Sequence, residues 1–200
     1  MFEAGQVAAP AIMGLTVVIS LLGMFQFPDI IIKFLFRPYF FLRERQYDTM
    51  IMSGFIHADM THLLFNMITF YFFAFPMEWF LGTPRFVALY FVGLVVSHTC
   101  TYWKERNNPQ YASLGASGAI SAVLFAYIVY FPTNMLYLFL AIPIPAFVFA
   151  IAYVYYSMWA SKHARDNINH DAHLCGALSG LAFVAVTDPQ AYSDLWAKLF

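Results

Sequence analysis

The chain has 200 residues, of which 62% are hydrophobic and only 10% are charged, and its formal net charge is −1. Soluble domains carry roughly 25% charged residues, so this composition excludes an ordinary soluble domain and indicates a membrane protein. The nearly balanced charge gives no sign of a nucleic-acid-binding surface. The length and the absence of a linker-like stretch predict one domain over residues 1–200.

Hydrophobic segments separated by turns predict an all-α, polytopic membrane protein with six transmembrane helices. A helix needs about 20 apolar residues to cross roughly 30 Å of hydrocarbon. The first span is expected at about residues 8–30, and it lacks the basic segment and cleavage site of a signal peptide. The other spans are expected, in chain order, at about residues 61–80, 86–103, 115–131, 135–159 and 173–187.

The segment between the first two spans, Lys33 to Met60, mixes aromatic and basic side chains. Rings and long basic side chains both suit the membrane interface, so this segment is expected to be a structured interfacial loop, with an ordinary solvated loop as the alternative.

The fourth and sixth spans are short. With about 15 to 17 apolar residues they cover roughly 25 Å, at 1.5 Å per residue. They are therefore expected to begin below the membrane surface, where non-helical backbone is tolerated only inside protein or beside water. A water-filled depression is predicted there.

Four polar side chains stand at the starts of spans two, four and six: His62, Asn66, Ser117 and His173. Because membrane-spanning helices alternate in direction, these three starts lie on the same side of the bilayer. Polar groups at membrane depth are costly and are functional candidates. A serine, two histidines and an asparagine together have the chemistry of an acyl-transfer site.

Each side chain has a role that this chemistry needs. Ser117 at a helix N-terminus has neighbouring N–H groups free to face a developing oxyanion. His173 is the type of base that activates a serine. His62 and Asn66 are four residues apart, share one helix face, and can both donate to one oxygen. The alternatives are close helix packing at Ser117, a hydrogen-bonded interfacial histidine at His173, and interhelical hydrogen bonding at His62 and Asn66.

Small residues are expected to bring two of these spans together. Gly176 and Gly180 follow His173 with the spacing of a helix-packing face, and Gly115 and Gly118 flank Ser117. No intramembrane carboxylate is placed to orient His173, so a serine–histidine dyad is predicted, with another contact holding the imidazole.

The remaining cysteines and histidines receive structural roles. Cys100 and Cys175 are expected to be small buried hydrophobic residues and not a disulfide. His163 and His170 are assigned mainly to loop structure.

At this point three motifs resemble those of the rhomboid family of intramembrane serine proteases. Residues 115–118 read G-A-S-G, like the family's G-x-S-G. Residues 57–66 resemble its H-x-x-x-x-H-x-x-x-N signature, and residues 172–180 resemble its A-H-x-x-G-x-x-x-G signature. Glu78 and Gly82 resemble the acidic residue and glycine that follow the second span.

The resemblance implies a six-helix rhomboid-like bundle that cleaves transmembrane segments of membrane-protein substrates within the lipid bilayer. Ser117 is implied as the nucleophile and His173 as the general base. His62, Asn66 and the backbone N–H of Ser117 are implied as the oxyanion hole. No cofactor, metal or nucleic acid is implied. Ser121 departs from the family, whose members often carry an aromatic residue there, packed on the catalytic histidine.

Two arguments about orientation conflict. The family resemblance implies a bacterial inner membrane with the active site opening to the non-cytoplasmic side, and this orientation is the one expected here. Loops after odd-numbered spans, however, carry eight basic residues against two on the other side, and the positive-inside rule would place the eight in the cytoplasm.

Two other functions remain open. A catalytically inactive rhomboid-like protein that binds membrane segments would have the same fold. A metal-binding protein would use His57, His62, His170 and His173, although no H-E-x-x-H motif is present.

Overall fold

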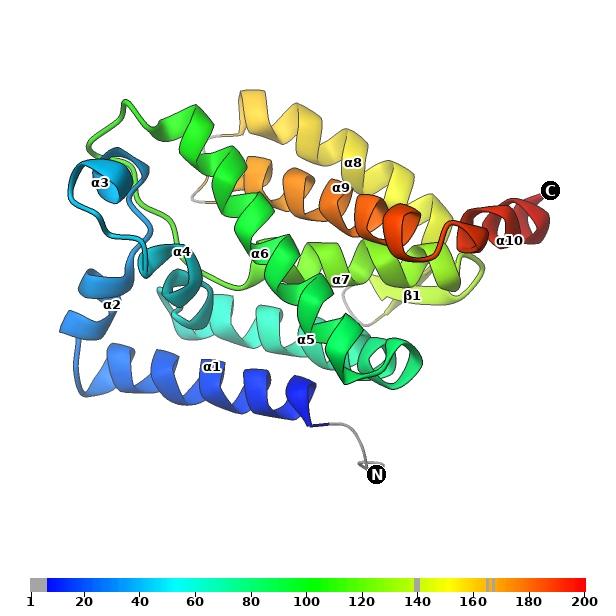
Figure 1. Cartoon of the computed structure of the whole chain (residues 1–200), viewed down its shortest axis with the longest axis horizontal. Helices are drawn as coiled ribbons and strands as arrows, with labels where there is room; N and C mark the ends of the chain where they lie inside the picture. Colours follow the sequence, from blue (N-terminus) through cyan, green and yellow to red (C-terminus); the bar gives the residue numbers. More distant parts are fainter. Residues whose placement is uncertain (1–6, 139–140, 165, 167) are drawn as a thin grey trace.

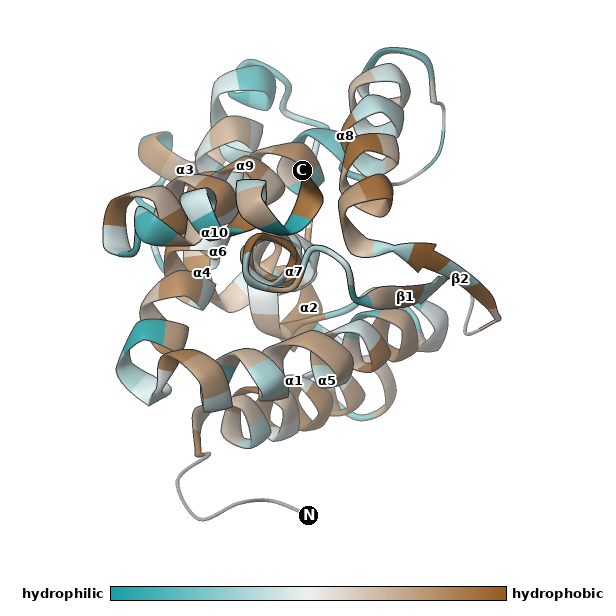
Figure 2. Cartoon of the chain, turned by 90° about the vertical axis from the view of Figure 1, so that its right-hand side faces the viewer, coloured by the Kyte–Doolittle hydropathy of each residue, from teal (hydrophilic) through white to brown (hydrophobic). Residues whose placement is uncertain are grey.

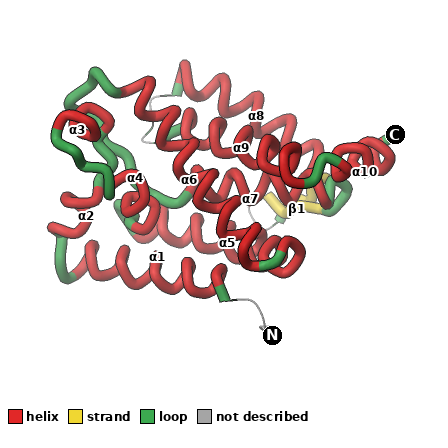
Figure 3. Tube along the Cα trace, in the orientation of Figure 1, coloured by secondary structure: helices red, strands yellow, loops and turns green. Residues whose placement is uncertain are grey.

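The computed structural model describes residues 7–138, 141–164, 166 and 168–200. Within that part of the chain the fold is a bundle of helices (Figures 1 and 3), which confirms the all-α class. The long helices are α1 (Ala8–Phe25), α5 (Met60–Leu81), α6 (Thr83–Glu105), α7 (Ser117–Tyr130), α8 (Ala146–His163) and α9 (His170–Thr187). Shorter elements are α2 (Asp29–Phe34), α3 (Pro38–Arg43), α4 (Thr49–Met52), the 3-10 turn η1 (Ser53–Phe55) and α10 (Gln190–Leu199).

Three of the described helices, α1, α5 and α6, are long and apolar enough to cross a membrane. The pair α9 and α10, bent by 112° at its junction, would make a fourth if it is one span. The helix α7 is apolar but has 14 residues, or roughly 21 Å at 1.5 Å per residue. These helices make the protein an integral membrane protein, but six crossings are not confirmed by length and hydropathy.

The expected fifth span at residues 135–159 is wrong in its first part. Strands β1 (Met135–Leu138) and β2 (Ile142–Pro145) form an antiparallel pair there, and α8 begins only at Ala146. Pro143 and Pro145 explain the difference, because proline has no N–H for a helix interior but is tolerated in an edge strand.

The helix α7 forms the centre of the bundle. Every one of its residues except Ser117 and Tyr127 is buried. A helix that is apolar on all sides is stable only when other helices surround it. In Figure 1 α5, α6 and α9 lie around α7, so the helix that begins at Ser117 is held from several directions.

Glycines let the neighbouring helices approach the backbone of α7. A Cβ atom added at Gly176 would lie 2.1 Å from the carbonyl oxygen of Gly118, and one at Gly180 would lie 2.1 Å from that of Ala122. A Cβ atom at Gly118 would lie 2.2 Å from Oγ of Ser97 on α6. No side chain fits at these positions, so α7 and α9 pack with their backbones in contact, and the side chain of Ser97 brings α6 against Gly118.

A buried carboxylate anchors α1. Glu78 near the end of α5 is 1% exposed. Its oxygens accept hydrogen bonds from the N–H groups of Val7, Ala8 and Ala9 at 2.7–3.1 Å and from the Thr83 hydroxyl at 2.7 Å. The unpaired N–H groups and positive dipole end of α1 thus meet a negative charge, which gives a structural role to this acidic residue.

The contact between α7 and α9 predicts that Gly176→Ala destabilises the protein. The added methyl group meets backbone, which cannot rotate away, and such overpacking costs roughly 1–3 kcal/mol. Thermal unfolding in detergent should therefore show a lower midpoint. Gly14→Ala is the matched control, because a Cβ at Gly14 meets nothing within 4 Å. Equal midpoints for the two variants would contradict the proposed backbone contact.

Candidate active site

The structure brings Ser117 and His173 together, although 56 residues separate them in the chain. Nε2 of His173 lies 2.7 Å from Oγ of Ser117. This is the distance of a good hydrogen bond between a hydroxyl and an imidazole nitrogen. It follows from the packing of α9 on α7, since both helices begin at the same end of the bundle.

The segment before Ser117 is held in place by backbone hydrogen bonds. The N–H of Gly115 donates to the carbonyl oxygen of Ser53 at 2.8 Å. Phe36 and Ser113 exchange two backbone hydrogen bonds, at 2.9 and 3.0 Å. Gly115 has a φ of +106°, which favours glycine. Ser117 therefore opens α7 after a turn that is fixed on both sides.

His98 supports that turn from α6. Its Nδ1 lies 3.0 Å from the Leu94 carbonyl oxygen, which can only accept, so Nδ1 carries the proton. Its Nε2 then accepts from the hydroxyl of Ser53 at 3.1 Å. The backbone carbonyl oxygen of the same Ser53 accepts the hydrogen bond from the N–H of Gly115. Ser53 therefore links His98 on α6 to the turn before Ser117.

His62 and Asn66 lie on α5 and border the same site. The Asp59 carboxylate caps α5 by accepting from the N–H of His62 at 2.8 Å. One N–H of the Asn66 amide donates to the carbonyl oxygen of His62 at 3.1 Å, which leaves its second N–H for another acceptor. The His57 ring packs against the His62 ring, with centroids 4.8 Å apart.

We expected Gly115 to belong to the helix-packing face, but it lies against His62 and not against α9. A Cβ atom added to it would lie 2.7 Å from Cε1 of His62. Glycine is needed there because the imidazole of His62 lies against the backbone before Ser117. Gly118, Gly176 and Gly180 are the residues that bring α7 and α9 together.

An open depression of about 1400 Å³ joins these side chains. Ser117, His173, His62 and Asn66 all line it. Its wall also carries polar side chains and apolar ones, among them Gln110, Tyr111, Asn169, Ile120, Leu124 and Phe149. The depression can therefore hold both water and an apolar peptide segment next to the serine hydroxyl.

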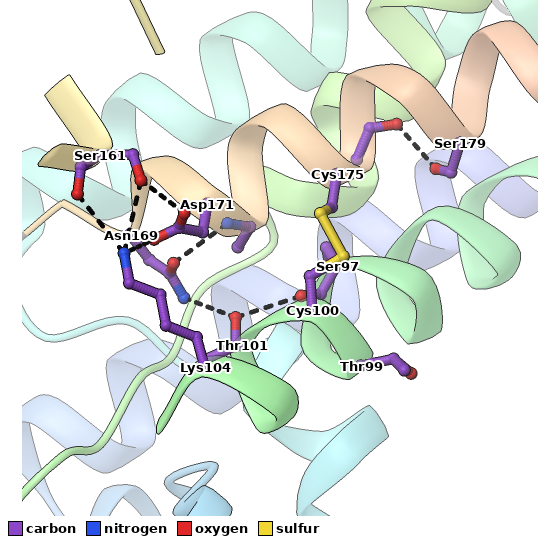
Figure 4. The surroundings of a disulfide bond; sticks show 12 residues. Ser97, Thr99, Cys100, Thr101, Lys104, Ser161, Asn169, Asp171, Cys175 and Ser179 are labelled. Carbon is purple, nitrogen blue, oxygen red and sulfur yellow. Dashed lines mark hydrogen bonds and ion pairs between the residues drawn. A yellow bond between two sulfur atoms is a disulfide. The ribbon is translucent and has the colours of Figure 1, made fainter. Parts of the chain in front are cut away.

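The first turn of α9 is fixed to α6 by side-chain contacts (Figure 4). The amide oxygen of Asn169 caps α9 by accepting from the N–H of Ala172 at 3.0 Å, and its amide nitrogen donates to Thr101 Oγ1 at 2.9 Å. Lys104 on α6 forms an ion pair with Asp171. These contacts position the turn that carries His173.

A disulfide bond completes this connection and corrects our expectation for the two cysteines. Cys100 on α6 and Cys175 on α9 are bonded, with their Cα atoms 6.5 Å apart (Figure 4). Cys175 lies two residues after His173. Hydrophobic surroundings suggested free thiols, but pairing depends on how the two helices are rotated, which spacing alone does not show.

His170, which we assigned to loop structure, is the first residue of α9 and is 5% exposed. Its ring meets the His173 ring edge to face, with the two ring centroids 6.2 Å apart. Its Nε2 lies 3.2 Å from each carboxylate oxygen of Asp166. The backbone N–H of Ile168 donates to the Asp166 carboxylate and, with His170, lowers its pKa. An ionised carboxylate therefore orients the ring that flanks His173.

Tyr153 on α8 is a residue of the site that the sequence alone did not single out. Its hydroxyl lies 2.8 Å from Oγ of Ser121, and that Oγ donates to the carbonyl oxygen of Ser117 at 2.9 Å. Tyr153 also lines the depression. An aromatic ring thus enters the site from α8, while position 121 itself carries a small hydroxyl.

No group of three or more His, Cys, Asp or Glu side chains in the described part of the chain is arranged to hold a metal ion.

A comparison with known protein families identifies the family of this protein. The Rhomboid domain family model matches residues 44–189. The protein belongs to the rhomboid family. The match includes the turn at Gly115, the α7–α9 contact and all four polar side chains of the depression.

Relatives of this rhomboid protein come from mitochondria and from a bacterium. RHOMBOID-like protein 12, mitochondrial, of Arabidopsis thaliana is 31% identical over 64% of this chain and 43% of its own length. The human Presenilin-associated rhomboid-like protein, mitochondrial, is 32% identical over 68% of this chain and 36% of its own length. "Putative rhomboid protease YdcA" of Bacillus subtilis is 30% identical over 66% of this chain and 63% of its own length.

The chain spans about two fifths of the length of the plant and human relatives it matches. The mitochondrial names among these relatives mean that the expected bacterial inner membrane is not supported.

The disulfide predicts a measurable contribution to stability. Replacing Cys100 and Cys175 together by alanine should lower the free energy of unfolding by roughly 2–4 kcal/mol, because the covalent link restricts the unfolded chain. Thermal unfolding with and without reductant measures this. Reductant should lower the midpoint of the unchanged protein but not that of the double variant. Two titratable thiols in the protein purified without reductant would contradict the bond.

Proposed function

We propose that this rhomboid-family protein is an intramembrane serine protease that uses a Ser117–His173 dyad. The observation that carries the proposal is the 2.7 Å contact between Nε2 of His173 and Oγ of Ser117 inside a depression of the bundle. A hydroxyl becomes a competent nucleophile when an adjacent imidazole accepts its proton. A packing serine has no need of this partner.

The acylation half of the proposed reaction has two proton transfers. Nε2 of His173 accepts the proton of Ser117 as Oγ attacks the scissile carbonyl carbon, and the imidazolium then donates that proton to the leaving amine. Water that enters the depression hydrolyses the acyl-enzyme, with His173 again as the base. The contact with His170 and the capped first turn of α9 hold the imidazole for both steps.

Three groups are proposed to stabilise the oxyanion. The N–H of Ser117 lies at the start of α7, where it has no intrahelical acceptor. His62 and the second N–H of the Asn66 amide border the same space from α5. Such donors act on the charge that develops in the transition state and are each worth about 2.7–4 kcal/mol.

Transmembrane protein segments are the proposed substrates. The site lies in the bundle of an integral membrane protein, and its depression has apolar walls beside the polar catalytic groups. A packed helix hides its carbonyl groups in hydrogen bonds, so a substrate would have to unwind locally before Ser117 could reach a peptide bond.

An inactive rhomboid-like protein that only binds membrane segments remains the second candidate. It would need the depression but not the contact between Ser117 and His173, so that contact favours the protease.

The dyad predicts that Ser117→Ala and His173→Ala each lower cleavage of a membrane-protein substrate by roughly 10⁴-fold or more. Asn66→Ala should lower it by roughly 10²–10³-fold, as expected for one oxyanion donor. Purified variants in detergent or vesicles would be compared in a cleavage assay. Ser193→Ala on the exposed face of α10 and His163→Ala, also exposed, are matched controls that should cleave normally.

A fluorophosphonate probe separates the two candidate functions without a known substrate. The protease requires labelling at Ser117 that is lost in His173→Ala. A folded protein that takes no label at Ser117 would support the binding module instead.

We infer that the active-site end of the bundle faces an oxidising, non-cytoplasmic compartment. The Cys100–Cys175 bond lies near that end, and disulfides persist in oxidising compartments. This opposes the distribution of basic residues in the loops, of which Lys104 is held in an ion pair with Asp171.

The inferred orientation predicts the behaviour of a reporter fused after Phe200. In a bacterial host the fusion should show the activity of a cytoplasmic reporter, because α9 runs from the active-site end to the opposite end of the bundle. A fused alkaline phosphatase that is active, and therefore exported, would reverse the orientation.

A further inference from the structure

The β-hairpin of β1 and β2 presents apolar side chains outward. Met135, Tyr137 and Ile142 are 54%, 61% and 54% exposed, whereas Leu136 is buried against α7 and α8. No charged residue occurs between Asn107 and Ser161. Figure 2 shows β1 and β2 extending sideways from the bundle, with strongly hydrophobic residues mainly on β2. In water, an exposed apolar strand of this kind would be a site of aggregation.

The two prolines of β2 occupy the outward-facing positions of its backbone. The strands pair Leu136 with Ile144, and the N–H of Ala146 donates to the Asn134 carbonyl oxygen at 2.9 Å. Residues whose N–H groups point toward a partner strand alternate along an antiparallel pair. Ala146 and Ile144 therefore point toward β1, while Pro143 and Pro145 fall on the outward positions.

This placement removes the backbone donors from the outer edge of β2. At any other residue, an outward N–H would remain without a partner unless water supplied one. An unsatisfied N–H costs several kcal/mol in hydrocarbon, which is why open sheet edges are normally excluded from it. With proline at both outward positions, that donor cost is absent.

The hairpin also continues an exposed apolar surface of α8. The helix α8 follows β2 directly, and its exposed side chains include Val148, Ile151 and Tyr155. In Figure 1 β1 lies at the end of the bundle where α7 ends and α10 begins, away from the first turn of α9. The hairpin is therefore next to the membrane surface opposite the depression.

We propose that strands β1 and β2 of the hairpin are inserted in the bilayer and pack against lipid acyl chains just below the headgroups, in the leaflet opposite the active-site mouth. The apolar side chains of the two strands, their lack of charge and the absence of outward N–H groups on β2 fit acyl chains as the partner. The proposal depends on membrane integration and not on proteolysis. The insertion of the hairpin and the Ser117–His173 dyad can therefore be tested independently.

Site-directed spin labelling in phosphatidylcholine vesicles tests the insertion. Nitroxides would be attached to Tyr137→Cys and Ile142→Cys, and their collision rates with oxygen and with a water-soluble nickel chelate would be measured by power saturation. Cys100 and Cys175 are bonded to each other and leave the added thiol to react. Val18→Cys on α1, a helix long and apolar enough to cross a membrane, is the lipid-facing control, and Asn107→Cys in the exposed polar loop after α6 is the water-facing control.

The expected result is an oxygen-to-nickel collision ratio at both hairpin positions that resembles that of Val18→Cys and is several-fold above that of Asn107→Cys. A ratio equal to that of Asn107→Cys would place the hairpin in water and overturn the proposal. Low collision rates with both reagents, together with spin–spin broadening, would also overturn it, because they would indicate a second copy of the chain as the partner.

Pro143→Ala tests the role of the donor-free edge. It restores an outward N–H, so its unfolding midpoint in vesicles should fall below that of Pro109→Ala, which loses a proline from an exposed loop. Both variants make the unfolded chain more flexible in the same way. Equal midpoints would show that the outward N–H is solvated and would contradict insertion.

Discussion

The contact between the backbones of α7 and α9 is the constraint on which the rest of the structure depends. Gly176 and Gly180 let α9 approach the carbonyl oxygens of Gly118 and Ala122 until no space is left for a side chain. In lipid, helices gain little from burying apolar side chains against each other, so close packing through small residues must hold them. Only at this separation does the imidazole of His173 meet the hydroxyl of Ser117.

Polar groups such as those around the dyad are costly inside a membrane unless they are hydrogen-bonded. In this protein they form two hydrogen-bonded groups. His98, Ser53 and Gly115 form one set, which fixes the turn before Ser117. Asn169, Thr101 and the Cys100–Cys175 bond fix the first turn of α9. Both sets include residues of α6. This helix contributes no proposed catalytic group, yet it aligns the two helices that do.

The two ends of the bundle differ in character. Around the depression, hydrogen bonds hold the turn before Ser117 and the first turn of α9. At the other end, α7 gives way to an apolar hairpin whose outer strand carries prolines at its outward positions. One end thus holds the open depression with the proposed active site, while the other carries the hairpin that we propose contacts lipid.

The sequence by itself determined the membrane class, the helical fold, the rhomboid family and the small set of polar residues that line the depression. These follow from overall composition and from short sequence motifs, which can be read without knowing how the helices pack. The tertiary structure alone decided the hairpin at residues 135–145, since an apolar run fits a strand and a helix equally well. It also decided the Cys100–Cys175 bond, the flanking of His173 by His170, and the entry of Tyr153 from α8. Each of these depends on how one helix is rotated and how closely it approaches another, which residue spacing along a single chain does not encode.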